Sequence, residues 1–117
     1  MFFALCRFEV FIPQGRSLKG KRSVVSGLKE RLRNRFRASV AEVDHQDLHQ
    51  RAALAVALVG VSPTALEAAL EAMRRLVEQE TRCCVTLWET RVEPFDGAPS
   101  ASFDDEDDEY YGPGGEG

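Results

Sequence analysis

The sequence has three cysteines, one tryptophan and no long apolar run. Because a membrane-spanning helix needs about 20 apolar residues, we predict that no segment spans a membrane. The first residues, MFFALCRFEVFIP, lack the basic start of a signal peptide and are interrupted by Arg7 and Glu9. Cys6, Cys83 and Cys84 do not have a spacing typical of a metal site. A cytoplasmic protein with reduced, buried or half-buried thiols and no cofactor is predicted.

Acidic residues are almost absent from residues 16–37, where Glu30 is the only one. This segment nevertheless contains nine basic residues: Arg16, Lys19, Lys21, Arg22, Lys29, Arg31, Arg33, Arg35 and Arg37. The chain as a whole has a formal net charge of −4, which is opposite in sign to this segment. Such a basic block on a small domain indicates a phosphate-bearing partner, above all nucleic acid.

Charge also divides the chain into two parts. A length of 117 residues suits a single domain with a real core. All 15 basic residues lie in residues 1–97, together with 12 acids, whereas residues 98–117 contain seven acids and no base. The last segment has too little apolar surface to offset the entropy of ordering it. We therefore predict a folded domain over residues 1–97 and a disordered acidic tail over residues 98–117.

Hydrophobic periodicity predicts six secondary-structure elements in the order βαββαβ. Alternation predicts a strand over residues 2–12, and apolar positions three and four apart predict a helix over residues 18–36. The remaining expected elements are strands at 39–44 and 51–61, a helix beginning at Ser62 and Pro63, and a strand at 84–92. Right-handed crossovers fold this order into the α+β ferredoxin-like sandwich, a four-stranded antiparallel sheet with two helices on one face.

Such a sheet leaves its second face without a cover. Residues 51–61 are apolar on both faces, and the strand at 2–12 has the partly apolar second face Phe3, Leu5 and Phe11. An exposed apolar face of this size indicates a partner, and self-association is the simplest one. We expect Phe3, Leu5, Phe11 and half of the 51–61 strand to be buried in a homodimer.

Residues 15–23, GRSLKGKRS, come close to the nucleotide-binding P-loop pattern GxxxxGK[ST]. Arg22, however, stands where the pattern needs a hydroxyl for magnesium, and Ser23 comes one residue late. A P-loop also requires a parallel sheet and a second-strand aspartate, which the predicted fold does not have. Nucleotide hydrolysis is therefore not predicted.

A weaker role in anion binding remains for the same helix. At 100° per residue, a basic stripe lies within about 80° of arc beside the apolar face, with Ser26 among its members. The basic stripe consists of Lys19, Arg22, Lys29, Arg33 and Arg37. Since Glu30 supplies almost no i,i+4 pairs, the charges have little structural role within the helix. We predict that Lys19, Lys21, Arg22, Lys29, Arg33 and Arg37 contact phosphates; a solvated helix face is the alternative.

A polar cluster surrounds the hairpin loop between the strands at 39–44 and 51–61 and consists of Glu42, Asp44, His45, Asp47 and His49. Metal binding would need these side chains to converge, and a hydrated turn is the simpler interpretation. A metal-dependent nuclease that uses Glu42 and Asp44 is a third hypothesis. No Ser, Cys or Lys has an evident base partner, so no catalytic residue and no enzymatic activity are predicted.

Two sequence blocks resemble the YlxP-like family of bacterial proteins. SLKGKRSVVSGLKERLRNRF is similar to its Ser-Leu-Lys-x-Lys-Arg segment, and the following ASVAEVD is similar to its strand pattern. Gly20 stands where the family more often has Glu, and the acidic tail lies outside the family pattern. The resemblance implies a ferredoxin-like fold. Family genes often neighbour translation-initiation and ribosome-maturation genes, which implies a role on RNA or the ribosome, without an established activity.

Together these features predict a small, non-enzymatic RNA-binding or ribosome-associated protein that uses the basic stripe. The alternative is a dimeric regulatory or protein-interaction module that binds a protein or a small anionic ligand. Nucleic-acid binding weakens steeply with salt, whereas an apolar protein interface does not, so salt dependence separates the two hypotheses.

Overall fold

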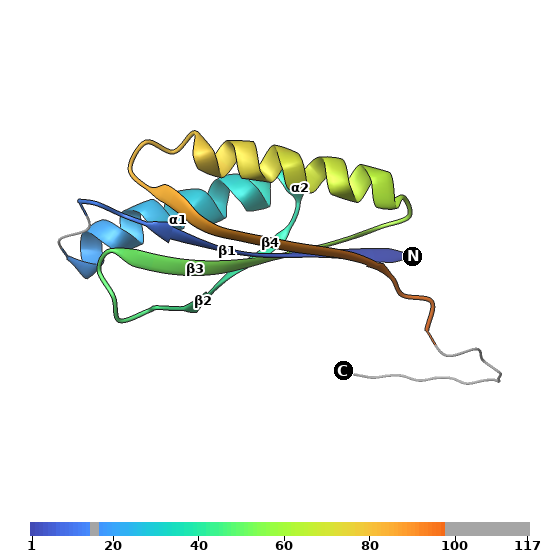
Figure 1. Ribbon diagram of the computed structural model, residues 1–117, viewed down its shortest axis with the longest axis horizontal. Helices are drawn as coiled ribbons and strands as arrows, with labels where there is room; N and C mark the ends of the chain where they lie inside the picture. Colours follow the sequence, from blue (N-terminus) through green and yellow to red (C-terminus); the bar gives the residue numbers. More distant parts are fainter. Residues whose placement is uncertain (15–16, 98–117) are drawn as a thin grey trace.

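The structure, a computed structural model, describes residues 1–14 and 17–97, and the predicted tail over residues 98–117 lies outside them. Its elements are β1 (Phe2–Phe11), α1 (Leu18–Phe36), β2 (Ser39–Asp44), β3 (Arg51–Gly60), α2 (Pro63–Glu78) and β4 (Cys84–Pro94). The four strands form one antiparallel sheet in the order β2-β3-β1-β4. Both helices lie on the same face of the sheet (Figure 1). The predicted ferredoxin-like βαββαβ fold is confirmed.

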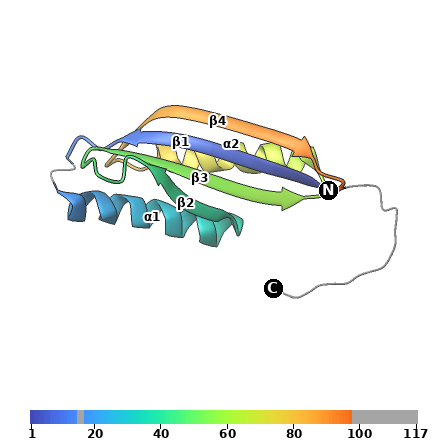
Figure 2. The same cartoon turned by 90° about the horizontal axis from the view of Figure 1, so that it is seen from below.

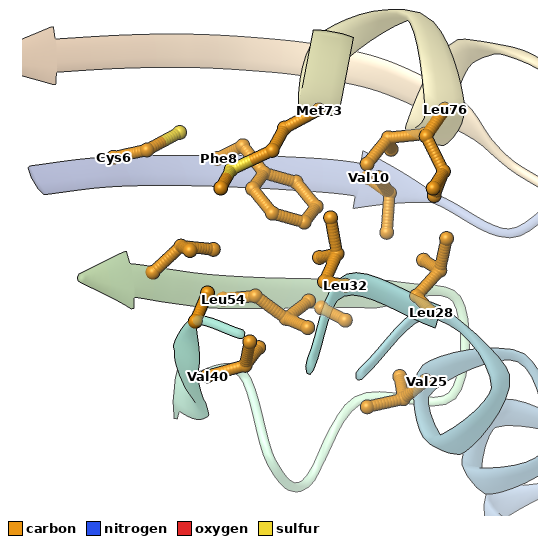
Figure 3. Packing of buried hydrophobic residues seen from close by; sticks show 14 of the residues in the cluster. Cys6, Phe8, Val10, Val25, Leu28, Leu32, Val40, Leu54, Met73 and Leu76 are labelled. Atoms are coloured by element: carbon orange, nitrogen blue, oxygen red, sulfur yellow. The ribbon is translucent and has the colours of Figure 1, made fainter. Parts of the chain in front are cut away.

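The two central strands supply the floor of the core. In β1, alternate residues Ala4, Cys6, Phe8 and Val10 are buried, as the period of a strand requires. β3 lies between β1 and β2 and buries Leu54 and Val56 on the same face. The side chains of both strands point toward the two helices (Figure 3). β1 ends at Phe11, one residue before the predicted end, and β4 continues to Pro94, beyond the predicted end at residue 92.

Serine hydroxyls define where both helices begin. Ser17 has extended backbone angles, and its Oγ accepts a hydrogen bond from the backbone N–H of Gly20 at 3.1 Å. Ser62 caps α2 in the same way, with the N–H of Ala65 at 3.2 Å, and Pro63 occupies the first turn. Such caps satisfy backbone donors that have no partner within the helix. The predicted start of the second helix is therefore confirmed.

The core is closed by contacts between the helices and the sheet. Leu28 and Leu32 of α1 and Met73 of α2 have no exposed side-chain surface and meet Phe8 and other strand residues (Figure 3). Phe8 also stacks on Trp88 of β4, with ring centroids 5.0 Å apart. Within the described residues, neither helix is long and apolar enough to span a membrane.

Two of the three thiols lie inside this core. Burial raises the pKa of Cys6 to about 12, although the charge of Arg74 acts in the opposite direction. Burial likewise raises the pKa of Cys83 to about 11. Cys84, its neighbour in the chain, is exposed, so the prediction of a buried or half-buried thiol is wrong for this residue. Because the thiolate is the nucleophilic form, Cys6 and Cys83 are inert packing residues at neutral pH.

The two helices occupy different positions relative to the sheet. α2 packs on the inner strands β1 and β3 and on β4, whereas the contact of α1 with the sheet is chiefly with the edge strand β2. Viewed toward the face without helices, α2 lies behind the strands, and α1 runs alongside β2 at the border of the sheet (Figure 2). One flank of α1 is consequently left uncovered by the sheet.

Candidate nucleic-acid interface

The basic stripe lies on the uncovered flank of α1 and at its C-terminal cap. Lys19, Arg22, Arg33 and Arg37 are exposed, and Lys29 is half-buried. At 1.5 Å per residue, the stripe extends over about 27 Å from residue 19 to residue 37. Its members are separated mostly by three or four residues, so neighbouring Cβ atoms are about 5–6 Å apart. The stripe is thus a linear row of cations.

The stripe is not neutralised by neighbouring acids. Within residues 1–14 and 17–97, no carboxylate oxygen lies within 4.0 Å of a charged nitrogen of any stripe residue. By contrast, Arg74 on α2 is paired with Glu78 at 3.1 Å. Like charges four residues apart destabilise a helix, so these cations do not increase the stability of α1. Their presence therefore indicates a role in binding.

Lys21 is a correction to the predicted phosphate-binding set. Its side chain is only 3% exposed, and it donates a hydrogen bond to the carbonyl oxygen of His45. Its Nζ also lies 3.0 Å from Glu42 Oε2, although that buried oxygen has no well-directed hydrogen bond among the described residues. Lys21 therefore binds α1 to β2 and the following turn, and cannot contact an external phosphate. The same orientation removes the lysine that a P-loop would need.

Arg33 has a structural role in addition to its exposed position. Its Nη2 donates a hydrogen bond of 2.8 Å to the carbonyl oxygen of Val40 in β2. β2 is an edge strand, and its free carbonyl groups could otherwise pair with another chain. Arg33 thus protects the sheet edge while its remaining donors stay available. Arg33 remains a member of the stripe, but replacing it would also remove its hydrogen bond to β2.

A second cationic cluster lies near the N-terminal half of α1. Glu80, in the turn after α2, is 7% exposed and accepts hydrogen bonds from Arg82 and Arg31. These bonds, chiefly those from Arg82, lower the pKa of the Glu80 carboxyl to about 2 against the effect of burial. With two guanidinium groups on one carboxylate, the cluster carries one surplus positive charge.

Arg82 also borders a cleft at the start of α1. Its Nη1 lies 3.5 Å from Ser23 Oγ, and the cleft is lined by Ile12, Pro13, Gly20, Ser23 and Arg82, among others. Arg82 could not be predicted as part of this cleft, because it stands alone in the turn between α2 and β4, some sixty positions from Ser23. No local pattern indicates this contact, which only the packing of that turn against α1 creates.

The polar residues at the end of β2 and in the following turn make contacts within the fold. Glu42 is paired with Lys21, and Arg7 lies 3.8 Å from Asp44. His45 has a left-handed backbone conformation with φ of 61°, and its Nε2 lies 3.3 Å from Glu9 Oε1. Across the described ranges, no three His, Cys, Asp or Glu side chains converge as metal ligands would. His49 is exposed beside Phe11 and Arg51.

Comparisons with known proteins agree with the architecture. A de novo designed protein with a ferredoxin fold, solved by NMR, superposes with a TM-score of 0.52 at 11% identity, covering 95% of this chain and 99% of that one. At this identity the similarity concerns the fold alone. The uncharacterized protein YlxP of Bacillus subtilis (strain 168) is 33% identical over 93 residues, which are 80% of this chain and 97% of that protein. The model of the DUF503 family, described as proteins of unknown function, matches residues 3–90, and the chain therefore belongs to this family.

Proposed function

We propose that this protein is a non-enzymatic RNA-binding protein of the cytoplasm that contacts RNA phosphates through the basic stripe. The observation that supports the proposal is the row of exposed cations on α1 that has no carboxylate partner among the described residues. Structured RNA, free or within a ribosomal particle, is the proposed partner. Lys21 takes no part, so the proposed contacts are Lys19, Arg22, Lys29, Arg33 and Arg37.

The geometry of the stripe suits a phosphate backbone better than a single small anion. A small anion would need several donors around one point, whereas the stripe distributes its charges over about 27 Å of helix. RNA duplexes are bound mostly through shape, phosphates and 2′-hydroxyl groups rather than through base edges. Because phosphate contacts carry little sequence information, we expect binding with low sequence preference.

The direct test is the salt dependence of binding to a duplex RNA of about 16 base pairs, measured by fluorescence anisotropy. Four or five phosphate contacts should give a slope of log affinity against log salt of roughly −3 to −4. Replacing Lys19, Arg22, Lys29 and Arg37 together with Gln should flatten this slope and weaken binding to unrelated RNA sequences equally. Arg33 is left unchanged because of its bond to Val40.

A matched control separates the stripe from net charge. The double variant R22Q/K29Q removes two charges from the stripe, and R74Q/R75Q removes two charges from α2. The first should reduce the salt slope by about 1.4 to 1.8, whereas the second should leave it nearly unchanged. Equal effects of the two variants, or no RNA binding by the parent protein at low salt, would contradict the proposal.

The alternative function is binding of a small anionic ligand in the cleft beside α1. It is favoured by the surplus positive charge of the Arg31, Arg82 and Glu80 cluster and by the hydroxyl of Ser23 at the cleft. Titration with inorganic phosphate, followed by NMR, would then shift the amide signals of Ser23 and Arg82. Saturation at the cleft, combined with the absence of RNA binding, would favour this alternative over the stripe.

A further inference from the structure

The face of the sheet without helices is divided into a polar half and an apolar half. The register places Ala53, Ala55 and Ala57 of β3 beside Glu9, Arg7 and Leu5 of β1, respectively. Ala53 has no exposed surface, whereas Ala55 and Ala57 are half-buried. The two halves therefore meet near the middle of the strands.

The polar half is covered by its own side chains. Glu9, which is 13% exposed, lies 2.9 Å from Arg7, 3.1 Å from Arg51 and 3.3 Å from His45. Burial raises the pKa of Glu9, but donors from Arg7, Arg51 and His45 outweigh it and lower the pKa below its usual value. This network accounts for the burial of Ala53, which is paired with Glu9 in the register. The polar half needs no partner.

The apolar half is not covered. Alternation from the strands places Met1, Phe3, Leu5, Val59, Val61 and Phe95 at the end of the sheet where the chain begins, and this set is the terminal patch. Leu5 is 47% exposed, Val59 69% and Val61 88%. The N-terminus and the end of β4 lie together at this end (Figure 1). Clustered exposure of this kind marks an interaction site.

We propose that the terminal patch is the contact between two copies of this chain in a two-fold homodimer. Arg91 and Glu93 lie 3.5 Å apart beside the patch. Because this border carries both signs of charge, it favours a second copy over a partner of one charge sign. Phe3 is paired with Glu93 in the register, and Leu5 is paired with Arg91. A two-fold axis between these rows exchanges them, so Phe3 of one copy faces Leu5 of the other and Glu93 faces Arg91. Each copy then supplies both signs of charge.

The area of the open face makes the proposed dimer interface a small one. A ten-residue strand is about 33 Å long, and four strands are about 19 Å wide, so the whole face offers roughly 600 Å² in projection. Each partner in a complex of standard size buries about 800 Å², so the dimer needs most of the face, including the alanines of β3, and lies at the small end of specific interfaces. Phe11 was expected within this contact; it is 38% exposed and lies at the polar end, next to Arg51, so the proposed dimer is centred on the opposite end of the sheet.

Light scattering of the full chain at about 20 μM, a concentration above the Kd of a dimer of micromolar affinity, tests the proposal. We expect twice the monomer mass of 13.0 kDa. L5D should give the monomer, whereas L48D should remain dimeric, because Leu48 is similarly exposed, at 44%, in the turn at the other end of the sheet. A monomeric parent protein, or equal effects of L5D and L48D, would overturn the proposal.

Charge exchange gives an independent test should L5D fail to fold. R91E and E93R each break the pair between Arg91 and Glu93 within the chain and place like charges against each other across the axis, so each variant alone should weaken the dimer at least tenfold. An equimolar mixture of R91E and E93R should form a heterodimer, because acids of one copy then face cations of the other. The absence of a heterodimer in the mixture would overturn the proposed axis. A parent protein that dimerises only after removal of residues 98–117 would show that its own C-terminal segment covers the patch, which would also overturn the proposal. None of these outcomes depends on RNA binding.

Discussion

Helices α1 and α2 lie on the same face of the sheet but differ in the number, sign and pairing of their charged residues. α1 contains seven basic residues and one acid, whereas α2 contains two basic residues and three acids. Each helix buries five residues, but in α1 one of the five is Lys21. On α2 the cation of Arg74 is paired with Glu78 and lies over the ring of Trp88. α2 is thus specialised for packing, and α1 both packs and presents charge.

The difference follows from where the two helices lie. α2 covers three strands, β4, β1 and β3, so its apolar face is broad and its outer face needs only ordinary solvation. α1 lies at the border beside β2, where a cation such as Lys21 can reach the carbonyl group of a turn and a carboxylate at the sheet edge. The same border position leaves the stripe accessible to a large partner.

The largest expected effect comes from the buried charge of α1. Lys21→Ala removes the partner of Glu42 and of the His45 carbonyl group, and should lower the free energy of unfolding by about 3 to 4 kcal/mol, as expected for a broken buried pair. The double variant K21M/E42L removes both charges and should recover most of this loss. Urea unfolding measures both values. A loss below about 0.5 kcal/mol would contradict a stabilising role of this buried pair and match the small contribution of an exposed one.

A smaller effect concerns Glu80, which connects α1 to the turn after α2. Hydrogen bonds from Arg82 and Arg31 lower its pKa in the fold to about 2, below the usual value of a glutamate, so its carboxylate stabilises the fold above about pH 5 and loses this contribution as pH falls toward 2. This lowering of the pKa corresponds to about 3 kcal/mol. Unfolding measured from pH 7 to pH 2 should show this loss. Glu80→Gln should be less stable at pH 7 and should show a flatter profile, and an unchanged profile would contradict the assignment.

The smallest expected effect is the loss of a capping hydrogen bond, which should be similar in the two helices. Ser17→Ala and Ser62→Ala each remove one capping hydrogen bond, and each should cost about 1 kcal/mol in thermal or urea unfolding. Lys19, Lys21 and Arg22 follow Ser17 and oppose the helix dipole, so added salt should stabilise α1 more than α2. Ser17→Gly and Ser62→Gly serve as controls, with losses of only a few tenths of a kcal/mol. Caps of very different cost would show that local propensity does not govern the helix starts.

The position of Lys21 on the helix predicts that its side chain is buried, although its charge suggests exposure. At 100° per residue, Lys21 lies within the arc of Val24, Val25, Leu28 and Leu32, close to its centre. Its charge led to its inclusion among the phosphate contacts, whereas its position predicts burial. Arg31 falls at the border of this arc, on the side of α2, and the structure pairs it with Glu80. Position on the helix was the better guide to both residues.

Local pattern by itself determined the six elements, their order, the cap at Ser62 and the exposed side of the stripe. These features depend on neighbours within a few positions, where alternation, helical spacing and backbone donors act. Only the tertiary structure decided the partners of Lys21, the approach of Arg82 to Ser23, and the division of the open face into a network around Glu9 and the terminal patch. Those contacts join residues far apart in the chain, and their geometry is set by strand register and helix placement, which no local sequence pattern encodes.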